Sequence, residues 1–176
     1  GYDEKIFYNY KINDKKYISD VCFIGSAFKD RVKLFEELYP YIKNLNIKII
    51  GNWLNNLSED SRLKKFVVKD FVKPEEAAKY YNGAKIVLNP HRNPYGQSLA
   101  SNLWDVKGSS PNPRLFEITA TNAFCITDKY REECFKFFKE GEEIDSFKDA
   151  KDLSSKIDYW LKEDEKRKEA VRMANE

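Results

Sequence analysis

The segment of residues 110–128 constrains the fold of this chain most, because it predicts a loop, a helix, a tight turn and a buried strand in close succession. Asn112 can cap the helix, and Pro113 suits its first position, where a backbone N–H is not needed. Asn122 can adopt the left-handed conformation that ends a helix. The apolar run at residues 123–127 is typical of a buried strand. The segment therefore indicates an α/β protein.

Helices and strands are expected to alternate along the rest of the chain in the same way. Apolar runs predict strands at residues 21–24, 66–68, 85–89 and 123–127, and two further strands are expected at residues 47–50 and 143–147. Amphipathic patterns predict helices at residues 31–43 (capped by Asp30), 74–83 and 129–139, and from 149 onward with a solvated end beyond Lys162. This alternation predicts βαβ units with right-handed crossovers. The fold class is thus α/β, a Rossmann-like doubly wound parallel sheet, whose ligand lies outside the carboxyl ends of the strands.

Length and composition are those of one folded domain. The chain has 176 residues, of which 41% are apolar, enough for a sizeable core. We expect residues 1–18 to be a linker or edge segment and residues 19–176 to form the domain. The net charge of +2 is too small to predict nucleic-acid binding. No apolar run approaches the roughly 20 residues of a transmembrane helix.

The three cysteines, Cys22, Cys125 and Cys134, lack the spacing of a metal site. We expect reduced structural thiols in a cytoplasmic protein, with a catalytic thiol or a zinc site as the alternatives. No cluster of His, Cys, Asp and Glu has metal-ligand spacing, so no intrinsic metal is expected. The chain begins with Gly1 rather than Met, which suggests a remnant of expression or an excised fragment.

Arg114 and Glu117 are the first candidates for a functional site. They are three residues apart on the predicted helix and therefore share a face. A cation and a carboxylate near a helix N-terminus, just past the end of a neighbouring strand, are the layout of a nucleotide site. Arg114 and the helix N-terminus suit phosphate oxygens, and Glu117 can accept hydrogen bonds from ribose hydroxyls. The alternative is an ordinary surface ion pair.

Residues 110–128 also resemble the donor-binding segment of GT-B glycosyltransferases, most closely that of the CgeB-like group. Three further segments resemble the same C-terminal domain in the same order. They are residues 20–26 followed by Arg31, residues 72–90, and residues 138–144 with the helix after them. The resemblance covers roughly residues 19–166.

The resemblance implies the C-terminal, donor-binding half of a hexosyltransferase-type enzyme. It implies a nucleotide-sugar donor, most often a UDP-sugar, no intrinsic cofactor, and Arg114 and Glu117 as the catalytic residues. It also implies a missing N-terminal acceptor-binding domain, so the isolated chain should bind nucleotide without transferring sugar. One feature departs from many retaining members, which carry a second glutamate seven residues earlier. Here Ser109 occupies that position, which leaves the sugar and the stereochemical outcome open.

Other residues are candidates for donor binding because they follow predicted strands or flank Arg114. They are Gly25, Ser26, Arg31, His91, Arg92, Ser110 and Asn112. Each also has a structural interpretation, such as a geometric glycine, a solvated arginine or a buried histidine. The long segment 91–112 contains Tyr95 and Trp104, which could stack on a ligand or pack against the domain.

The main rival is a non-catalytic Rossmann-like module that binds a nucleotide or a protein partner. A small-molecule oxidoreductase is a weaker alternative, because the glycine fingerprint of dinucleotide-binding folds is absent.

Overall fold

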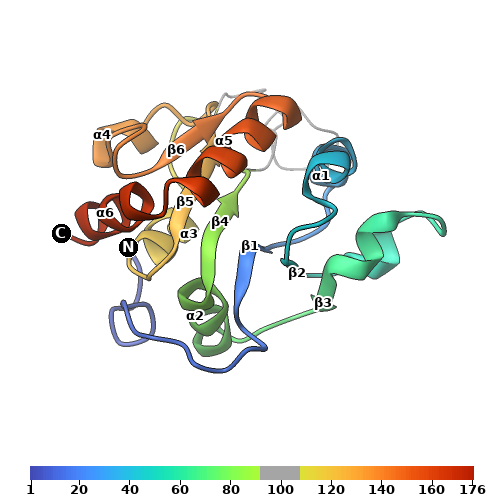
Figure 1. Cartoon of the computed structure of the whole chain (residues 1–176), viewed down its shortest axis with the longest axis horizontal. Coiled ribbons are helices and arrows are strands. Elements are labelled where there is room, and N and C mark those ends of the chain that lie inside the picture. The colour runs from blue at the N-terminus through green and yellow to red at the C-terminus, as the bar shows by residue number, and fades with distance from the viewer. Residues whose placement is uncertain (92–107) are drawn as a thin grey trace.

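The computed structural model describes residues 1–91 and 108–176, which contain a parallel sheet with the strand order β3-β2-β1-β4-β5-β6 (Figure 1). The chain begins at the centre of this sheet and winds outward in both directions, as in other doubly wound folds. The predicted Rossmann-like α/β class is therefore confirmed. The strands are β1 (Ser19–Ile24), β2 (Ile47–Ile50), β3 (Val67–Lys69), β4 (Ala84–Asn89), β5 (Phe124–Asp128) and β6 (Asp145–Phe147).

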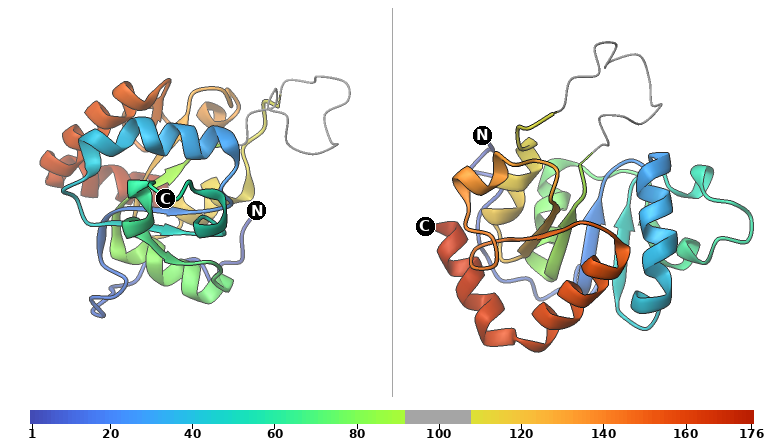
Figure 2. Two further views of the ribbon diagram at one scale, coloured as in Figure 1. Left: turned by 90° about the vertical axis from the view of Figure 1, so that its right-hand side faces the viewer. Right: turned by 90° about the horizontal axis from the view of Figure 1, so that it is seen from above.

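Helices cover both faces of the sheet (Figure 2). On one face, α1 and α5 pack on the sheet around Phe23. On the other face, α2 and α3 pack around Cys22. The helices and 3-10 turns are α1 (Lys29–Ile42), η1 (Leu54–Asn56), η2 (Arg62–Phe66), α2 (Pro74–Gly83), α3 (Pro113–Thr119), α4 (Cys134–Phe137), α5 (Ala150–Lys162) and α6 (Asp164–Asn175).

The central strands read as continuous apolar runs because both of their faces are buried. In β1, Val21 and Phe23 point into the core under α1, while Cys22 points into the core under α2. All three side chains are fully buried. The same reasoning explains the apolar runs of β4 and β5.

Residues 1–18 form turns and irregular chain rather than the edge strand considered from the sequence. Phe7 and Tyr17 are nevertheless buried, in the core that includes α2. The side-chain amide of Asn82 on α2 donates to the Tyr8 carbonyl at 3.0 Å. This segment is thus attached to the domain through α2.

Two predicted helix ends differ from the structure. α1 begins at Lys29 with Phe28 as its N-cap, so Asp30 lies in the first turn and is not the cap. α3 ends at Thr119 with a right-handed C-cap, three residues before Asn122. At the end of α3, the N–H groups of Ala120 and Thr121 donate to the carbonyls of Phe116 and Ile118, so the helix ends without a left-handed C-cap.

The C-terminal part differs more. Residues 129–139 contain only the short helix α4, and the expected solvated end is the helix α6, which has a buried side. Ala170 and Val171 join the core, and Arg167 donates to the Trp160 carbonyl at 2.5 Å. Despite its high charge density, this segment has a narrow apolar stripe, and α6 packs against α5, α3 and β5.

Candidate functional site

The turn after β1 lies at the carboxyl edge of the sheet and is fixed by the last residue of β2 and by residues that follow it. The Gly25 N–H donates to the Ile50 carbonyl at 2.8 Å, and the Gly25 carbonyl accepts from Trp53 Nε1 at 2.8 Å. Gly51 has a φ of +141° and lies directly against the same carbonyl. A Cβ atom on Gly51 would lie 2.9 Å from the Gly25 carbonyl carbon, so only glycine fits there.

Arg31 and Arg114 bring two guanidinium groups to this turn. A Cβ atom on Gly25 would lie 3.3 Å from Arg31 Nη1 and 3.4 Å from Arg114 Nη1. Arg31 is only 6% exposed, and it donates to the carbonyls of Ser26 at 3.2 Å and Pro90 at 2.8 Å. Because Pro90 follows β4, this side chain spans the ends of β1 and β4. Two cations therefore flank a glycine at the point where the strand order reverses.

Arg114 also lies beside two other ionisable groups. Burial raises the pKa of the Tyr81 hydroxyl, and the nearby Arg114 opposes that shift. Burial likewise raises the pKa of Glu117, again with Arg114 opposing the shift. The predicted proximity of Arg114 and Glu117 is thus seen, with Tyr81 as a third member of the cluster.

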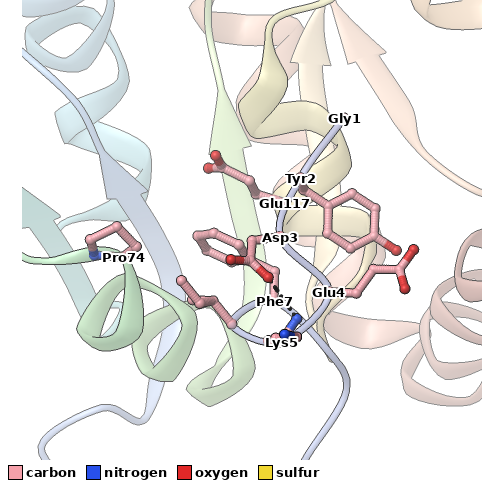
Figure 3. Close-up of a pocket in the computed structure, with 9 residues that line it drawn as sticks. Gly1, Tyr2, Asp3, Glu4, Lys5, Phe7, Pro74 and Glu117 are labelled. Atoms are coloured by element: carbon pink, nitrogen blue, oxygen red, sulfur yellow. Dashed lines mark hydrogen bonds between the residues drawn. The ribbon is translucent and has the colours of Figure 1, made fainter.

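Glu117 lines an open pocket of about 720 Å³. The pocket lies between the start of α2 at Pro74, helix α3 and the N-terminal segment 1–7 (Figure 3). Glu117 is half-buried at its wall, and Tyr2 and Asp3 lie on the side of the N-terminal segment. A pocket of this size can hold a nucleoside.

Asn112 fixes the start of α3. Its side-chain oxygen accepts from the Leu115 N–H at 3.0 Å, which is the predicted cap. Its amide also forms two hydrogen bonds with the amide of Asn89, at 3.0 and 3.1 Å. Asn89 is the last residue of β4, so the start of α3 is tied to the end of this strand.

His91 is buried at the same strand end and is not an exposed ligand group. Its Nδ1 lies 2.8 Å from Asp128 Oδ2, and its backbone N–H donates to the same oxygen. Its Nε2 accepts from the Asn112 N–H at 3.3 Å. Burial opposes ionisation of Asp128, but the side-chain and backbone hydrogen bonds from His91 hold the pKa of that carboxyl below its usual range.

Ser110 is exposed just before α3, and its hydroxyl donates to Glu133 at 2.8 Å. Ser109 donates to the other oxygen of Glu133 at 3.2 Å. These two hydrogen bonds hold the pKa of Glu133 below its usual range. The predicted candidates Arg92, Tyr95 and Trp104 lie outside the described residues.

The structure brings most of the predicted candidates together in two groups. Gly25, Ser26, Arg31 and Arg114 form one, and His91 and Asn112 form the other. Sequence reasoning missed Gly51, Tyr81, Asn89 and Asp128. Asn89 and Asp128 did carry a signal, since each is a polar residue that closes an apolar strand.

Within residues 1–91 and 108–176, no three His, Cys, Asp or Glu side chains are grouped so that they could hold a metal ion. The same part of the chain has no helix with the length and apolarity needed to span a bilayer. Cys22, Cys125 and Cys134 are free and buried.

Comparison with protein families matches residues 31–176 to the family described as Glycosyl transferase-like. The spore protein CgeB of Bacillus subtilis (strain 168) is 32% identical over 163 residues. The match covers 90% of this chain and 48% of CgeB, so the chain spans about half the length of that relative.

Solved structures show the same fold at low identity. The C-terminal domain of LpcC, a glycosyl transferase group 1 family protein from Francisella tularensis, has a TM-score of 0.69 at 14% identity. That match covers 99% of this chain and 95% of the LpcC domain. A mutant of T4 phage BGT in complex with UDP-glucose has a TM-score of 0.61 at 16% identity, covering 89% of this chain and 42% of BGT.

The expected fold, the C-terminal half of a GT-B glycosyltransferase, is therefore confirmed, as is the similarity to CgeB. The family match over most of its length shows that this chain belongs to the Glycosyl transferase-like family.

Proposed function

We propose that this chain is the nucleotide-sugar-binding half of a glycosyltransferase, with a UDP-sugar as the donor. Residues 19–176 would form the binding domain, and residues 1–18 the linker to a preceding acceptor-binding half. The observation that carries the proposal is the approach of Arg31 and Arg114 to the Gly25 turn. Guanidinium groups bind phosphate oxygens with two parallel hydrogen bonds, and a glycine lets a diphosphate approach the backbone closely.

The pocket beside Glu117 supports the same ligand. A ribose at Glu117 would place its hydroxyls against a carboxylate that burial makes easier to protonate. The ionised form accepts from both hydroxyls through charge-assisted hydrogen bonds, which are stronger than those that the protonated acid accepts. Affinity should therefore be full above the raised pKa of Glu117 and should fall as the pH drops through it.

The relatives favour uridine as the base and transfer as the reaction. T4 phage BGT, which shares the fold, was solved in complex with UDP-glucose. In a transfer reaction, Arg114 would stabilise the charge that develops on the leaving diphosphate. The acceptor would be held by the preceding half, because this chain spans 48% of CgeB.

Calorimetric titration with UDP and with uridine tests the proposal. Arg114→Ala removes a charged partner of the diphosphate, so UDP affinity should fall by about 1.5–3 kcal/mol while uridine affinity changes little. Arg172→Ala, on the exposed side of α6, is the matched control. Glu117→Gln should weaken UDP and uridine alike, whereas Glu165→Gln, at an 89% exposed side chain, should weaken neither.

The absence of any binding of UDP, GDP or ADP at millimolar concentration would refute the donor-site proposal. Equal losses of UDP and uridine affinity in Arg114→Ala would instead refute the assignment of Arg114 to the phosphates. Sugar transfer is expected only when the preceding half is present, because catalysis needs donor and acceptor held together.

A further inference from the structure

We propose that His91 is a positioning residue for this site, locked by Asp128 in one tautomer so that its Nε2 anchors the start of α3. Through this hydrogen bond to Asn112, His91 positions the side chain of Arg114. The inference rests on the proposed function, because the diphosphate is what a well-placed Arg114 would bind.

The hydrogen bonds define the tautomer. Nε2 of His91 faces the Asn112 N–H at 3.3 Å, so it must be the unprotonated acceptor. The ring proton therefore lies on Nδ1 and is donated to Asp128 Oδ2, 2.8 Å away. Asp128 accepts a second bond from the His91 backbone and a third from the Tyr130 N–H at 3.2 Å. Three donors thus hold this carboxylate in the orientation that selects the tautomer.

The anchored residue is Asn112, which immediately precedes α3. Its backbone N–H is held by His91 and its side chain by Asn89, so both attachments lead to the end of β4. α3 has only seven residues, and Arg114 is its second. A shift at Asn112 would therefore move the Arg114 side chain away from Gly25 directly.

His91 has no ring nitrogen left for a ligand. Its side chain is 4% exposed, and both nitrogens are engaged within the protein. This distinguishes it from Arg114, whose guanidinium reaches the turn itself. The role of His91 is thus to act through Asn112 rather than on the donor.

Two substitutions of His91 distinguish its hydrogen bond to Asp128 from its hydrogen bond to Asn112. An asparagine amide reaches the position of Nδ1 but not that of Nε2, whereas a glutamine amide reaches the position of Nε2. His91→Asn should lose the anchor and raise the Kd for UDP about fivefold, the effect of one hydrogen bond. His91→Gln should restore the affinity to within about twofold. Uridine affinity should change in neither variant.

A double-mutant cycle tests whether the effect passes through Arg114. On the Arg114→Ala background, His91→Asn should cause no further loss of UDP affinity. A loss that persists on this background would overturn the positioning role. Equal UDP affinities for His91→Asn and His91→Gln would also overturn it.

The tautomer of His91 can be determined by NMR in the absence of any ligand. The chain contains one histidine, so the imidazole signals in a nitrogen-detected NMR spectrum need no assignment. We expect a protonated Nδ1, an unprotonated Nε2, and slow hydrogen exchange of the Asn112 amide that becomes fast in His91→Asn. A protonated Nε2 in the neutral ring would overturn the inference. Failure of the unchanged chain to bind UDP, GDP or ADP would refute the proposed function, while these NMR readouts would still decide whether His91 anchors Asn112.

Discussion

Replacing Gly51 by alanine is the sharpest test of how the site is built. Gly51 cannot move away from a new methyl group, because its N–H donates to the Lys69 carbonyl at 2.9 Å and its own carbonyl accepts from the Trp53 N–H at 2.7 Å. The methyl group would overlap the carbonyl of Gly25, which itself holds Trp53 Nε1 at 2.8 Å. Hydrogen bonds therefore hold the backbone in place both at Gly51 and at Gly25.

Two effects lower the free energy of unfolding of Gly51→Ala, and they add. A side chain at a φ of +141° costs about 1–3 kcal/mol in backbone strain. Overpacking against the Gly25 carbonyl costs about 1–3 kcal/mol more. The expected loss in the free energy of unfolding is about 4 kcal/mol, which lowers the Tm of a domain this size by roughly 8–16 °C.

The matched control is Gly141→Ala. Gly141 also has a positive φ, of +80°, but a Cβ atom there meets nothing within 4 Å. The free energy of unfolding of Gly141→Ala should therefore fall only by the backbone strain of about 1–2 kcal/mol. A second control, Gly83→Ala, forces a Cβ atom to 2.7 Å from the Tyr17 carbonyl carbon, at the end of α2 remote from the Gly25 turn.

Urea unfolding and UDP titration together distinguish these cases. Gly51→Ala and Gly83→Ala should both lose stability, but only Gly51→Ala should also lose UDP affinity, since it displaces Gly25. The contact argument is wrong if Gly51→Ala is no more destabilising than Gly141→Ala. The link to the site is wrong if Gly51→Ala and Gly83→Ala bind UDP equally well.

Three further outcomes follow from buried groups. Trp160→Phe should cost about 1–3 kcal/mol in urea unfolding, because Asp145 Oδ2 loses the indole N–H at 2.7 Å. The pKa of Asp128 is lower in the folded state than in the unfolded state. The ionised carboxylate therefore stabilises the fold at a pH above the pKa of the unfolded state, and this stabilisation is lost as the pH falls through the pKa of the folded state. The Tm of Asp128→Asn should therefore decrease less than that of the unchanged chain as the pH is lowered. Burial raises the pKa of Cys22 to about 12 and of Cys134 to about 11, so mass spectrometry should find neither alkylated at pH 8 until the chain is unfolded.

The parts of the fold that the sequence predicted are those with local signals. The strand at residues 47–50 and the helix at residues 74–83 match β2 and α2 in full. Three isoleucines within four residues mark the strand, and Pro74 and Gly83 mark the ends of the helix. The second half of the C-terminal helix pair was misread, because burial of Val171 depends on neighbours that are distant in sequence.

The site was predictable as a set of residues and not as a geometry. Arg114 was identified from its place beside a helix cap, and Arg31 from its place after a strand. Nothing in the sequence shows that both reach Gly25, since that depends on the packing of two helices against opposite faces of the sheet. The bond from His91 to Asp128 was missed for the same reason, because it joins the ends of two strands that pair only in the folded sheet.

The position of the site follows from the winding of the chain. After β1 the chain enters α1 on one face of the sheet, and the segment after β4 leads to α3 on the other face. The connections diverge between β1 and β4, the point at which doubly wound folds bind their ligands outside the carboxyl ends of the strands. Arg31 reaches this point from α1 and Arg114 from α3, so the two guanidinium groups approach Gly25 from opposite faces. Like charges brought this close repel each other, and a dianion between them would turn that repulsion into attraction from both sides. The same winding that builds the sheet thus brings together the two cations that we propose as the diphosphate site.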